Sequence, residues 1–181
     1  MSKAFLRESD FPDPSPPPPA PPALPPGAKN YITPEGAEKL RAELDELKLQ
    51  IRPSLATEAA TDVDAKSELQ RVDQRIRHLN SSLRTAEIVG PPIPADPVVR
   101  FGSTVTVREG SGVESTYRLV GVDETNAEQG LISWVSPLAR ALINSKVGDV
   151  VEVRTPAGLR ALEITRIDYD TLRSASRFGH R

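Results

Sequence analysis

The sequence predicts an α+β protein, with an N-terminal antiparallel helical hairpin (a coiled coil) and a C-terminal small antiparallel sheet that carries one helix. Three observations predict this class. Two apolar stripes repeat at helical spacing in the first half, the apolar period changes to two in the second half, and a proline-rich stretch separates the halves. We divide the chain into a disordered arm (1–30), the hairpin (31–89), a linker (90–97), the base domain (98–170) and a basic tail (171–181).

Proline defines the arm, because residues 11–30, FPDPSPPPPAPPALPPGAKN, contain ten of the chain's 18 prolines. Proline fixes φ and has no backbone N–H, so we expect an extended, polyproline-like segment without a packed core. A linker or tail is the commoner meaning of such a composition. Docking on a partner's aromatic groove is the alternative.

The first helix of the hairpin is predicted to begin after Thr33, which is placed to cap it. Pro34 follows in the first turn, where its missing N–H costs nothing, and Glu35 complements the positive end of the helix dipole. Pro53 predicts a kink, since the apolar stripe continues past it. The stripe has spacings of four, three, four and four, and consists of Leu40, Leu44, Leu47, Ile51 and Leu55.

A second stripe predicts the returning helix, with spacings of three, four, three and four, and consists of Leu69, Val72, Ile76, Leu79 and Leu83. Two such stripes joined by a short polar loop make an antiparallel hairpin. Neither helix has a second apolar face, so the hairpin should stay thin. Its distal end, around Asp62 and Asp64, should therefore project away from the base domain.

The segment GPPIPADP, residues 90–97, breaks the helical pattern and is predicted to be an interdomain linker. A helix is expected within 136–148, with Ser136 as its cap, Pro137 at its first position and Gly148 after its end. Around it we expect five short strands, at 105–109, 115–123, 130–136, 149–155 and 161–169.

Composition excludes several classes of function. A net charge of −2 argues against a general DNA or membrane-surface binder. The absence of cysteine removes disulfides, thiolate nucleophiles and cysteine-based metal sites. No run of about 18 apolar residues occurs, and the N-terminus lacks an apolar core of signal-peptide length. We expect a cytoplasmic protein with no membrane partner.

Four carboxylates gather where the hairpin turns, namely Glu58, Asp62, Asp64 and Glu68. One interpretation is a solvated loop in which Asp62 or Asp64 caps the second helix. The other is a tip that presents metal ligands, because paired carboxylates hold Mg²⁺ and usually borrow further ligands from water or a partner. Such a tip would complete a metal site in another protein, and the chain is expected to hold no metal or cofactor of its own.

Other candidate groups are few. His78 and His180 lie far apart in sequence, without a nucleophilic serine or an oxyanion loop, and His78 is interpreted as a solvated helix residue. Arg71 and Arg75 lie on one helix face and are candidates to meet a nucleic-acid backbone. Exposed arginines on a charged helix usually serve solubility alone.

Four stretches resemble the Gre-type bacterial transcription elongation factors, and the GreB branch more than GreA: ITPEGAEKLRAELDELK, RVDQRIRHLNSSLRTAEIV, ISWVSPLARALINSKVGDVVEVRTPAG and LEITRIDY. The similarity covers about residues 31–170. It implies a coiled coil inserted through the secondary channel of RNA polymerase and an FKBP-like C-terminal domain that binds the channel rim. In this family two acidic tip residues help to hold a catalytic Mg²⁺, and the polymerase then cleaves backtracked RNA.

The chain departs from the family pattern at two places. The family's tip signature is absent, and the hairpin is shorter by roughly ten residues, or about five per arm. At about 1.5 Å per helical residue, this withdraws the tip by roughly 7–8 Å. In the rim-binding motif Val135 replaces an aspartate, while the Ser-Pro pair and its helix remain. The resemblance assigns polymerase contact to Val135, Ser136, Pro137, Leu138, Ala139 and Arg140.

We hypothesise a monomeric regulator of transcription elongation that binds RNA polymerase through its secondary channel, without strong transcript cleavage. The close alternative is a factor that stimulates RNA cleavage through its acidic tip. An oligomerising coiled-coil adaptor is an alternative of another class, and a prolyl isomerase is disfavoured because the base domain has few aromatic residues. The chain itself is expected not to be an enzyme, and to contact RNA or DNA only within the polymerase complex.

Overall fold

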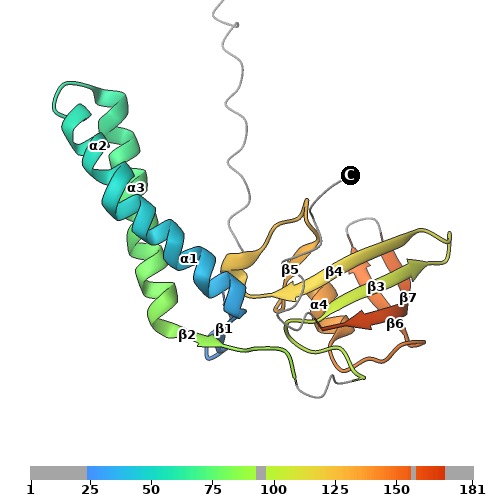
Figure 1. Ribbon diagram of the computed structural model, residues 1–181. Helices are drawn as coiled ribbons and strands as arrows, with labels where there is room; N and C mark the ends of the chain where they lie inside the picture. Colours follow the sequence, from blue (N-terminus) through green and yellow to red (C-terminus); the bar gives the residue numbers. More distant parts are fainter. Residues whose placement is uncertain (1–23, 93–96, 156–157, 170–181) are drawn as a thin grey trace, which may run out of the picture.

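The structure is a computed structural model that describes residues 24–92, 97–155 and 158–169. Most of the predicted arm, part of the linker and the predicted basic tail lie outside these described residues. The rest forms a helical hairpin that extends from one side of a small sheet domain, as predicted (Figure 1). No helix within the described ranges is long and apolar enough to cross a membrane.

The outgoing arm of the hairpin begins where the sequence predicts. The Oγ1 of Thr33 accepts a hydrogen bond from the Gly36 N–H at 3.0 Å and caps the first helix. The returning helix starts after Asp62 and ends at Thr85. The elements are α1 (Pro34–Glu46), a π-helical turn η1 (Leu47–Ile51), α2 (Arg52–Glu58) and α3 (Val63–Thr85).

Just before Pro53, where the sequence predicts a kink, the structure has a π-helical turn. Within this turn the Arg52 N–H donates to the Leu47 carbonyl, five residues back rather than four. A π-turn holds one residue more than a regular helical turn, and the stripe from Leu47 to Leu55 advances by four and four instead of four and three. The extra residue in the spacing is thus absorbed by the turn, and Leu55 still packs against the hairpin core.

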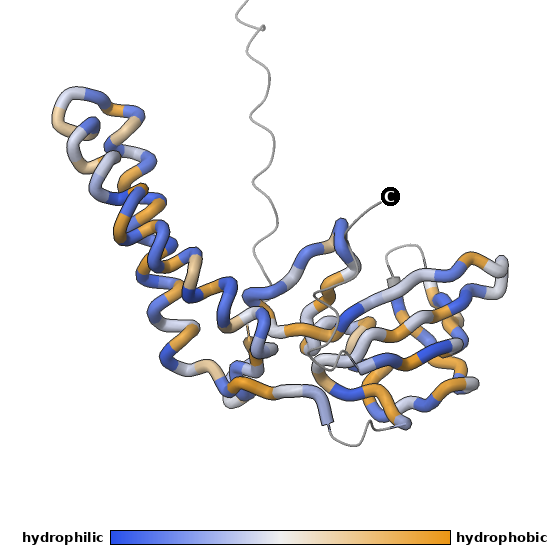
Figure 2. The backbone as a smooth tube through the Cα atoms, in the orientation of Figure 1, coloured by the Kyte–Doolittle hydropathy of each residue, from blue (hydrophilic) through white to orange (hydrophobic). Residues whose placement is uncertain are grey.

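Apolar residues recur along both arms of the hairpin (Figure 2), and their side chains form a buried cluster between the helices. Leu79 on α3 is fully buried, whereas Leu49 on the outer face is 75% exposed. The core is a single row between two helices, so the hairpin is a thin rod without a second packing layer. Its buried members are Ile32, Ala37, Leu40, Leu44, Leu47, Val72 and Leu79.

A two-stranded parallel sheet closes the hairpin at its base. Strand β1 (Asn30–Ile32) pairs with β2 (Ala86–Ile88), and Asn30 lies opposite Ala86. The Asn30 side chain also donates to the Ser82 carbonyl at 3.0 Å. The sequence does not predict these strands, and its boundary for the arm at residue 30 is wrong, because Asn30 already belongs to β1.

The base domain contains five strands near the predicted positions, in the spatial order β5-β4-β3-β7-β6. The prediction of an antiparallel sheet is wrong for one pair, since β5 runs parallel to β4, with Arg118 opposite Leu131. Strand β4 ends at Val120, and a 3-10 turn, η2 (Val122–Glu124), begins the crossover that makes this pairing possible. The strands are β3 (Thr104–Glu109), β4 (Glu114–Val120), β5 (Leu131–Ser133), β6 (Val150–Thr155) and β7 (Gly158–Asp168).

One helix, α4 (Pro137–Leu142), packs on the sheet, as predicted. Ser136 caps it, because its Oγ accepts from the Ala139 N–H at 3.2 Å. The helix is shorter than the predicted stretch of 136–148. It ends because Ile143 is extended and Asn144 adopts a left-handed conformation with φ of 70°.

Candidate functional site

The tip of the hairpin uses Asp62 to begin α3. The Asp62 backbone is extended, and its Oδ1 accepts a hydrogen bond from the Asp64 N–H at 2.8 Å. This is the capping role that the sequence left open between the two aspartates. Both side chains are exposed.

The other two tip carboxylates are engaged locally. Glu58 accepts a hydrogen bond from the Ser54 hydroxyl at 3.2 Å, and Glu68 forms an ion pair with Arg71 at 3.0 Å. Among the described residues, no group of three or more histidine, cysteine, aspartate or glutamate side chains is arranged to hold a metal ion. Asp62 and Asp64 could supply at most part of a metal site, which a partner and water would have to complete.

Replacing Asp62 with alanine should destabilise the tip more than replacing Asp64. Asp62→Ala removes the α3 cap and should lower the free energy of unfolding by about 1 kcal/mol. Asp64→Ala removes only a favourable charge in the first turn and should cost about half of that. Urea unfolding of the two variants, followed by far-UV circular dichroism, measures the difference. Equal losses would contradict the capping role of Asp62.

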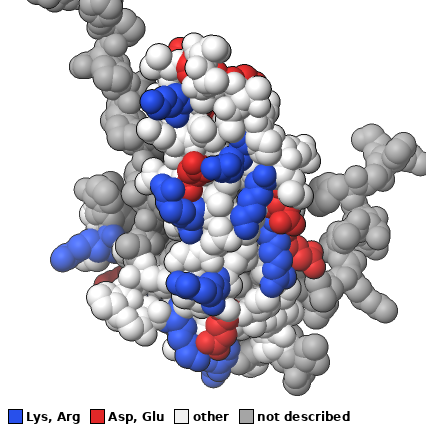
Figure 3. All heavy atoms as spheres, turned by 90° about the vertical axis from the view of Figure 1, so that its left-hand side faces the viewer, with Lys and Arg blue, Asp and Glu red and all other residues white. Residues whose placement is uncertain are grey.

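Lys and Arg side chains lie along the hairpin face below the tip, mixed with acidic ones (Figure 3). Arg75 binds both carboxylate oxygens of Glu43 on α1, at 2.6 and 2.8 Å. This hydrogen bond raises the pKa of the Arg75 guanidinium above its ordinary value. Arg71 is paired with Glu68. Nucleic-acid contact through Arg71 and Arg75 stays a prediction, and it would have to compete with these carboxylates.

His78 is not merely a solvated helix residue, because it links the hairpin to the base domain. Its Nε2 lies 2.7 Å from an Asp123 carboxylate oxygen in η2. The Asp123 side chain is only 8% exposed and also accepts a hydrogen bond from the Ser82 hydroxyl on α3. Sequence reasoning missed this contact, since the partner is 45 positions away along the chain.

Glu124 fixes the other hairpin arm to the base. Its carboxylate accepts hydrogen bonds from the Thr33 N–H at 2.9 Å, from the Thr33 hydroxyl and from the Gly121 N–H at 2.8 Å. A Cβ on Gly36 would lie 1.9 Å from a Glu124 oxygen, so only glycine leaves room for this carboxylate. Two consecutive acidic residues of η2 thus fix the hairpin to the base domain. Glu124 holds the start of α1, and Asp123 holds the C-terminal part of α3.

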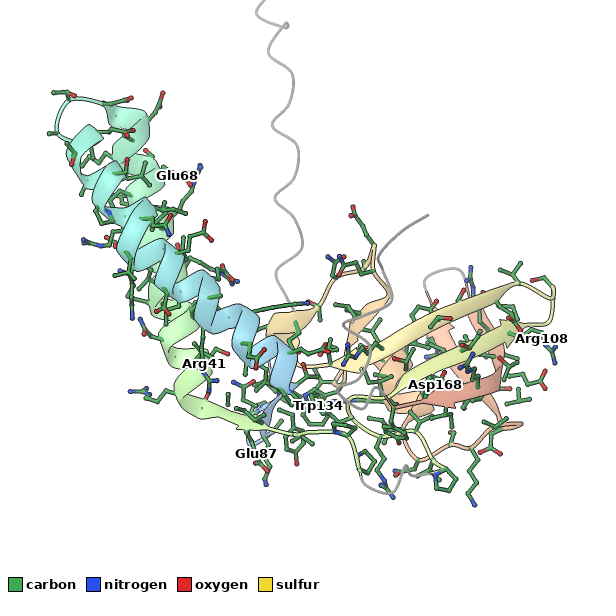
Figure 4. All side chains as sticks on the ribbon, viewed as in Figure 1. Arg41, Glu68, Glu87, Arg108, Trp134 and Asp168 are labelled. Atoms are coloured by element: carbon green, nitrogen blue, oxygen red, sulfur yellow. The ribbon has the colours of Figure 1, made fainter. Side chains whose placement is uncertain are left out.

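Trp134 lies where the hairpin joins the base (Figure 4), and it belongs to a group of three aromatic rings. The ring of Tyr31 on β1 lies 5.6 Å from that of Phe101 and 5.1 Å from that of Trp134, between centroids. They line a pocket of about 460 Å³. These contacts join β1 to the base domain, and an ion pair between Arg118 and Glu35, at 2.8 Å, joins α1 to it.

The segment predicted to contact a polymerase begins directly after Trp134. Val135 is only 9% exposed and Ala139 is buried, so their side chains serve the core of the base domain. Ser136 is engaged as the helix cap, and Leu138 is half-buried. Pro137 and Arg140 are the exposed members of this segment. A partner that binds here would therefore meet mainly these two side chains.

A projecting hairpin with an acidic tip on a small sheet domain is the arrangement that the resemblance to Gre-type transcription factors implies. Residues 94–169 match the family described as "Transcription elongation factor, GreA/GreB, C-term". The chain is 38% identical over 154 residues to the transcription elongation factor GreB of Neisseria meningitidis serogroup A, a match that covers 78% of this chain and 94% of the relative. It is 40% identical over 152 residues to the GreA of Verminephrobacter eiseniae, with 76% and 96% covered. The chain belongs to the GreA/GreB family of transcription elongation factors.

A solved structure, the GreA/GreB factor from Nitrosomonas europaea, is 26% identical, with 78% of this chain and 99% of that chain covered and a TM-score of 0.39. This chain and its relatives differ in length over the region that they share. The alignment with the V. eiseniae GreA is 152 positions long. It includes only 76% of this 181-residue chain, or about 138 residues, so the remaining positions are gaps in this chain. This chain is therefore shorter than its relative over the region that the two share.

Proposed function

We propose that this chain binds RNA polymerase and inserts its hairpin into the secondary channel, where it modulates elongation without strong stimulation of transcript cleavage. The observation that carries this proposal is the form of the tip. It projects on a thin rod, as a channel-inserted element requires, but Asp62 caps α3, and no group of three or more possible metal ligands is assembled among the described residues. The chemistry in such a complex belongs to the polymerase, and this chain is not itself an enzyme.

The length of the hairpin is the second argument, because it limits how far the tip extends into the channel. The 23 residues of α3 give a helix about 35 Å long. If the residues that this chain lacks relative to its family fall in the hairpin, roughly ten of them shorten each arm by about five residues, or roughly 7–8 Å. Metal coordination tolerates errors of only about 0.2 Å. A tip withdrawn by that distance occupies the channel but does not complete a metal site at its far end.

The alternative, stimulation of cleavage through an atypical tip, is favoured by one observation. Asp62 and Asp64 are both exposed at the end of the rod, where a partner could reach them. An oligomerising adaptor finds less support, because the apolar stripes already bury each other within one chain and Leu79 has no exposed surface left. In either polymerase-binding case we infer a monomer.

A transcript-cleavage assay on backtracked RNA polymerase tests the proposal. The chain should co-purify with core polymerase, and a photo-crosslinker at position 62 should react with it, while cleavage stays near the rate without a factor. The N. meningitidis GreB serves as the positive control for cleavage. Asp62→Asn and Asp64→Asn separate metal binding from helix capping, because asparagine caps a helix about as well as aspartate but is a poorer metal ligand. Robust cleavage that these variants abolish would establish the alternative, and failure to bind polymerase would overturn both.

A further inference from the structure

The pocket at the hairpin–base junction has no role in the proposed function. It is open, mainly apolar and about 460 Å³ in volume. Tyr31, Phe101 and Trp134 form its aromatic lining, and Pro92 and Ile143 extend the apolar surface. Arg100 and Glu87 are the charged residues of the lining. Aromatic-lined grooves of this kind are the recognition sites for proline-rich segments in the polyproline II conformation.

Trp134 carries a second indication of a ligand. Its indole Nε1 is buried, and it has no hydrogen-bond acceptor among the described residues. A buried donor without a partner is unfavourable, so a ligand that brings an acceptor within reach of Nε1 would be stabilised. A polyproline II segment makes no internal hydrogen bonds and therefore offers free backbone carbonyls.

The chain carries such a segment in its own arm. A polyproline II helix has three residues per turn, so residues three apart share a face. Pro16, Pro19 and Pro22 form one unbroken row, and Asp13 continues it by one further turn. This face matches the pocket in two respects, since its prolines suit the aromatic rings and Asp13 is complementary in charge to Arg100. The Arg100 guanidinium already donates to the Asn144 side chain at 3.4 Å, so Asp13 would add to this contact.

The described end of the arm starts beside the pocket. The Ala28 N–H donates to the Pro25 carbonyl at 3.0 Å, and Gly27 has a positive φ of 79°. Residues 25–28 therefore form a reverse turn. After this turn Lys29 pairs with Glu87 at 3.0 Å and Tyr31 enters the pocket lining. The described chain therefore reverses direction at residues 25–28, a few positions before Tyr31 of the pocket lining.

We propose that residues 13–22 dock as a polyproline II segment in the aromatic pocket of the same chain, with Pro16, Pro19 and Pro22 on the rings and Asp13 toward Arg100. Ten residues in this conformation extend about 31 Å, which is enough to cross the pocket from the turn at residues 25–28. The proposal concerns the free protein and does not depend on polymerase binding.

Trp134 is the only tryptophan in the chain, so its fluorescence reports on the pocket without a label. In the full-length protein, replacing Pro16, Pro19 and Pro22 with glycine should increase acrylamide quenching of Trp134 by about twofold, because the docked face is lost. The matched control replaces Pro17, Pro18 and Pro21 with glycine, in the same arm but off the docking face, and should have a clearly smaller effect. Equal effects of the two variants, or none, would overturn the proposal.

A charge exchange tests the orientation of the arm. Asp13→Arg and Arg100→Glu should each increase quenching, and the double variant should restore the original value. Additive increases in the double variant would contradict the Asp13–Arg100 contact. The quenching must also be independent of protein concentration, because a dependence on dilution would mean that the arm of a second copy occupies the pocket, which excludes docking within one chain.

Discussion

Leu79→Ala should lower the free energy of unfolding of the hairpin by about 3–5 kcal/mol. Leu79 is fully buried between the two helices, and the hairpin has only one row of core side chains. No second layer can collapse into the cavity, so the loss should lie in the upper part of the range for such substitutions. Urea unfolding monitored by far-UV circular dichroism measures it.

Leu49→Ala is the matched control, since it is the same substitution on the same hairpin. Leu49 is 75% exposed, so its loss should change the free energy of unfolding by no more than about 0.5 kcal/mol. A similar loss for both variants would mean that the stripe assigned to the hairpin core does not hold the helices together.

Glu124→Ala should release the hairpin from the base domain. The carboxylate accepts from Thr33 and Gly121, and its removal leaves the buried Thr33 N–H without its acceptor. We expect a loss of about 2–4 kcal/mol at the junction, because hydrogen bonds to a charged group are among the stronger ones. The helices and the sheet should both survive, since neither core includes Glu124.

Distance measurements between two spin labels detect this release directly. The chain has no cysteine, so cysteines in place of Val63 at the hairpin tip and Val113 at the far β3–β4 turn can be labelled specifically; these valines are 78% and 57% exposed. The distance distribution should broaden severalfold in Glu124→Ala and stay narrow in Glu128→Ala, a control at an exposed acidic residue after the same turn. An unchanged distribution in Glu124→Ala would show that the other junction contacts suffice.

Local chemistry made much of the fold predictable from the sequence. The caps at Thr33 and Ser136 depend on residues within three positions, and the structure confirms both. The two apolar stripes predicted a hairpin because each repeats with helical spacing, and the change to a period of two placed all five strands. The π-turn also left a trace, in the consecutive spacings of four around Ile51, although it was interpreted as a kink at Pro53.

Contacts between distant segments could not be predicted in the same way. Glu124 and Thr33 are 91 positions apart, and nothing near either residue indicates the other. The parallel pairing of β5 depends on the crossover after η2, and β1 and β2 are strands only because the folded hairpin brings them together. These features arise from tertiary packing, which overrides weak local preferences.

In the candidate site, too, local features were predictable and contacts between distant residues were not. The sequence located the tip carboxylates at the end of the hairpin, but it could not decide between Asp62 and Asp64 as the cap. It treated Arg75 as available, whereas Glu43 on the facing helix binds it. In the Val135–Arg140 segment it could not separate buried from exposed members, because a short irregular turn before a helix has no reliable period.

The π-turn at Leu47–Ile51 also controls where the end of the rod points around its own axis. One residue in a helix corresponds to about 100° of rotation. If the same residues formed a regular α-helix instead, α2 with Glu58 would lie about that angle further round relative to α1, and Leu55 would leave the hairpin core. The π-turn therefore keeps Glu58 on the side of the hairpin that it would occupy without the extra residue, although the turn itself contains no carboxylate.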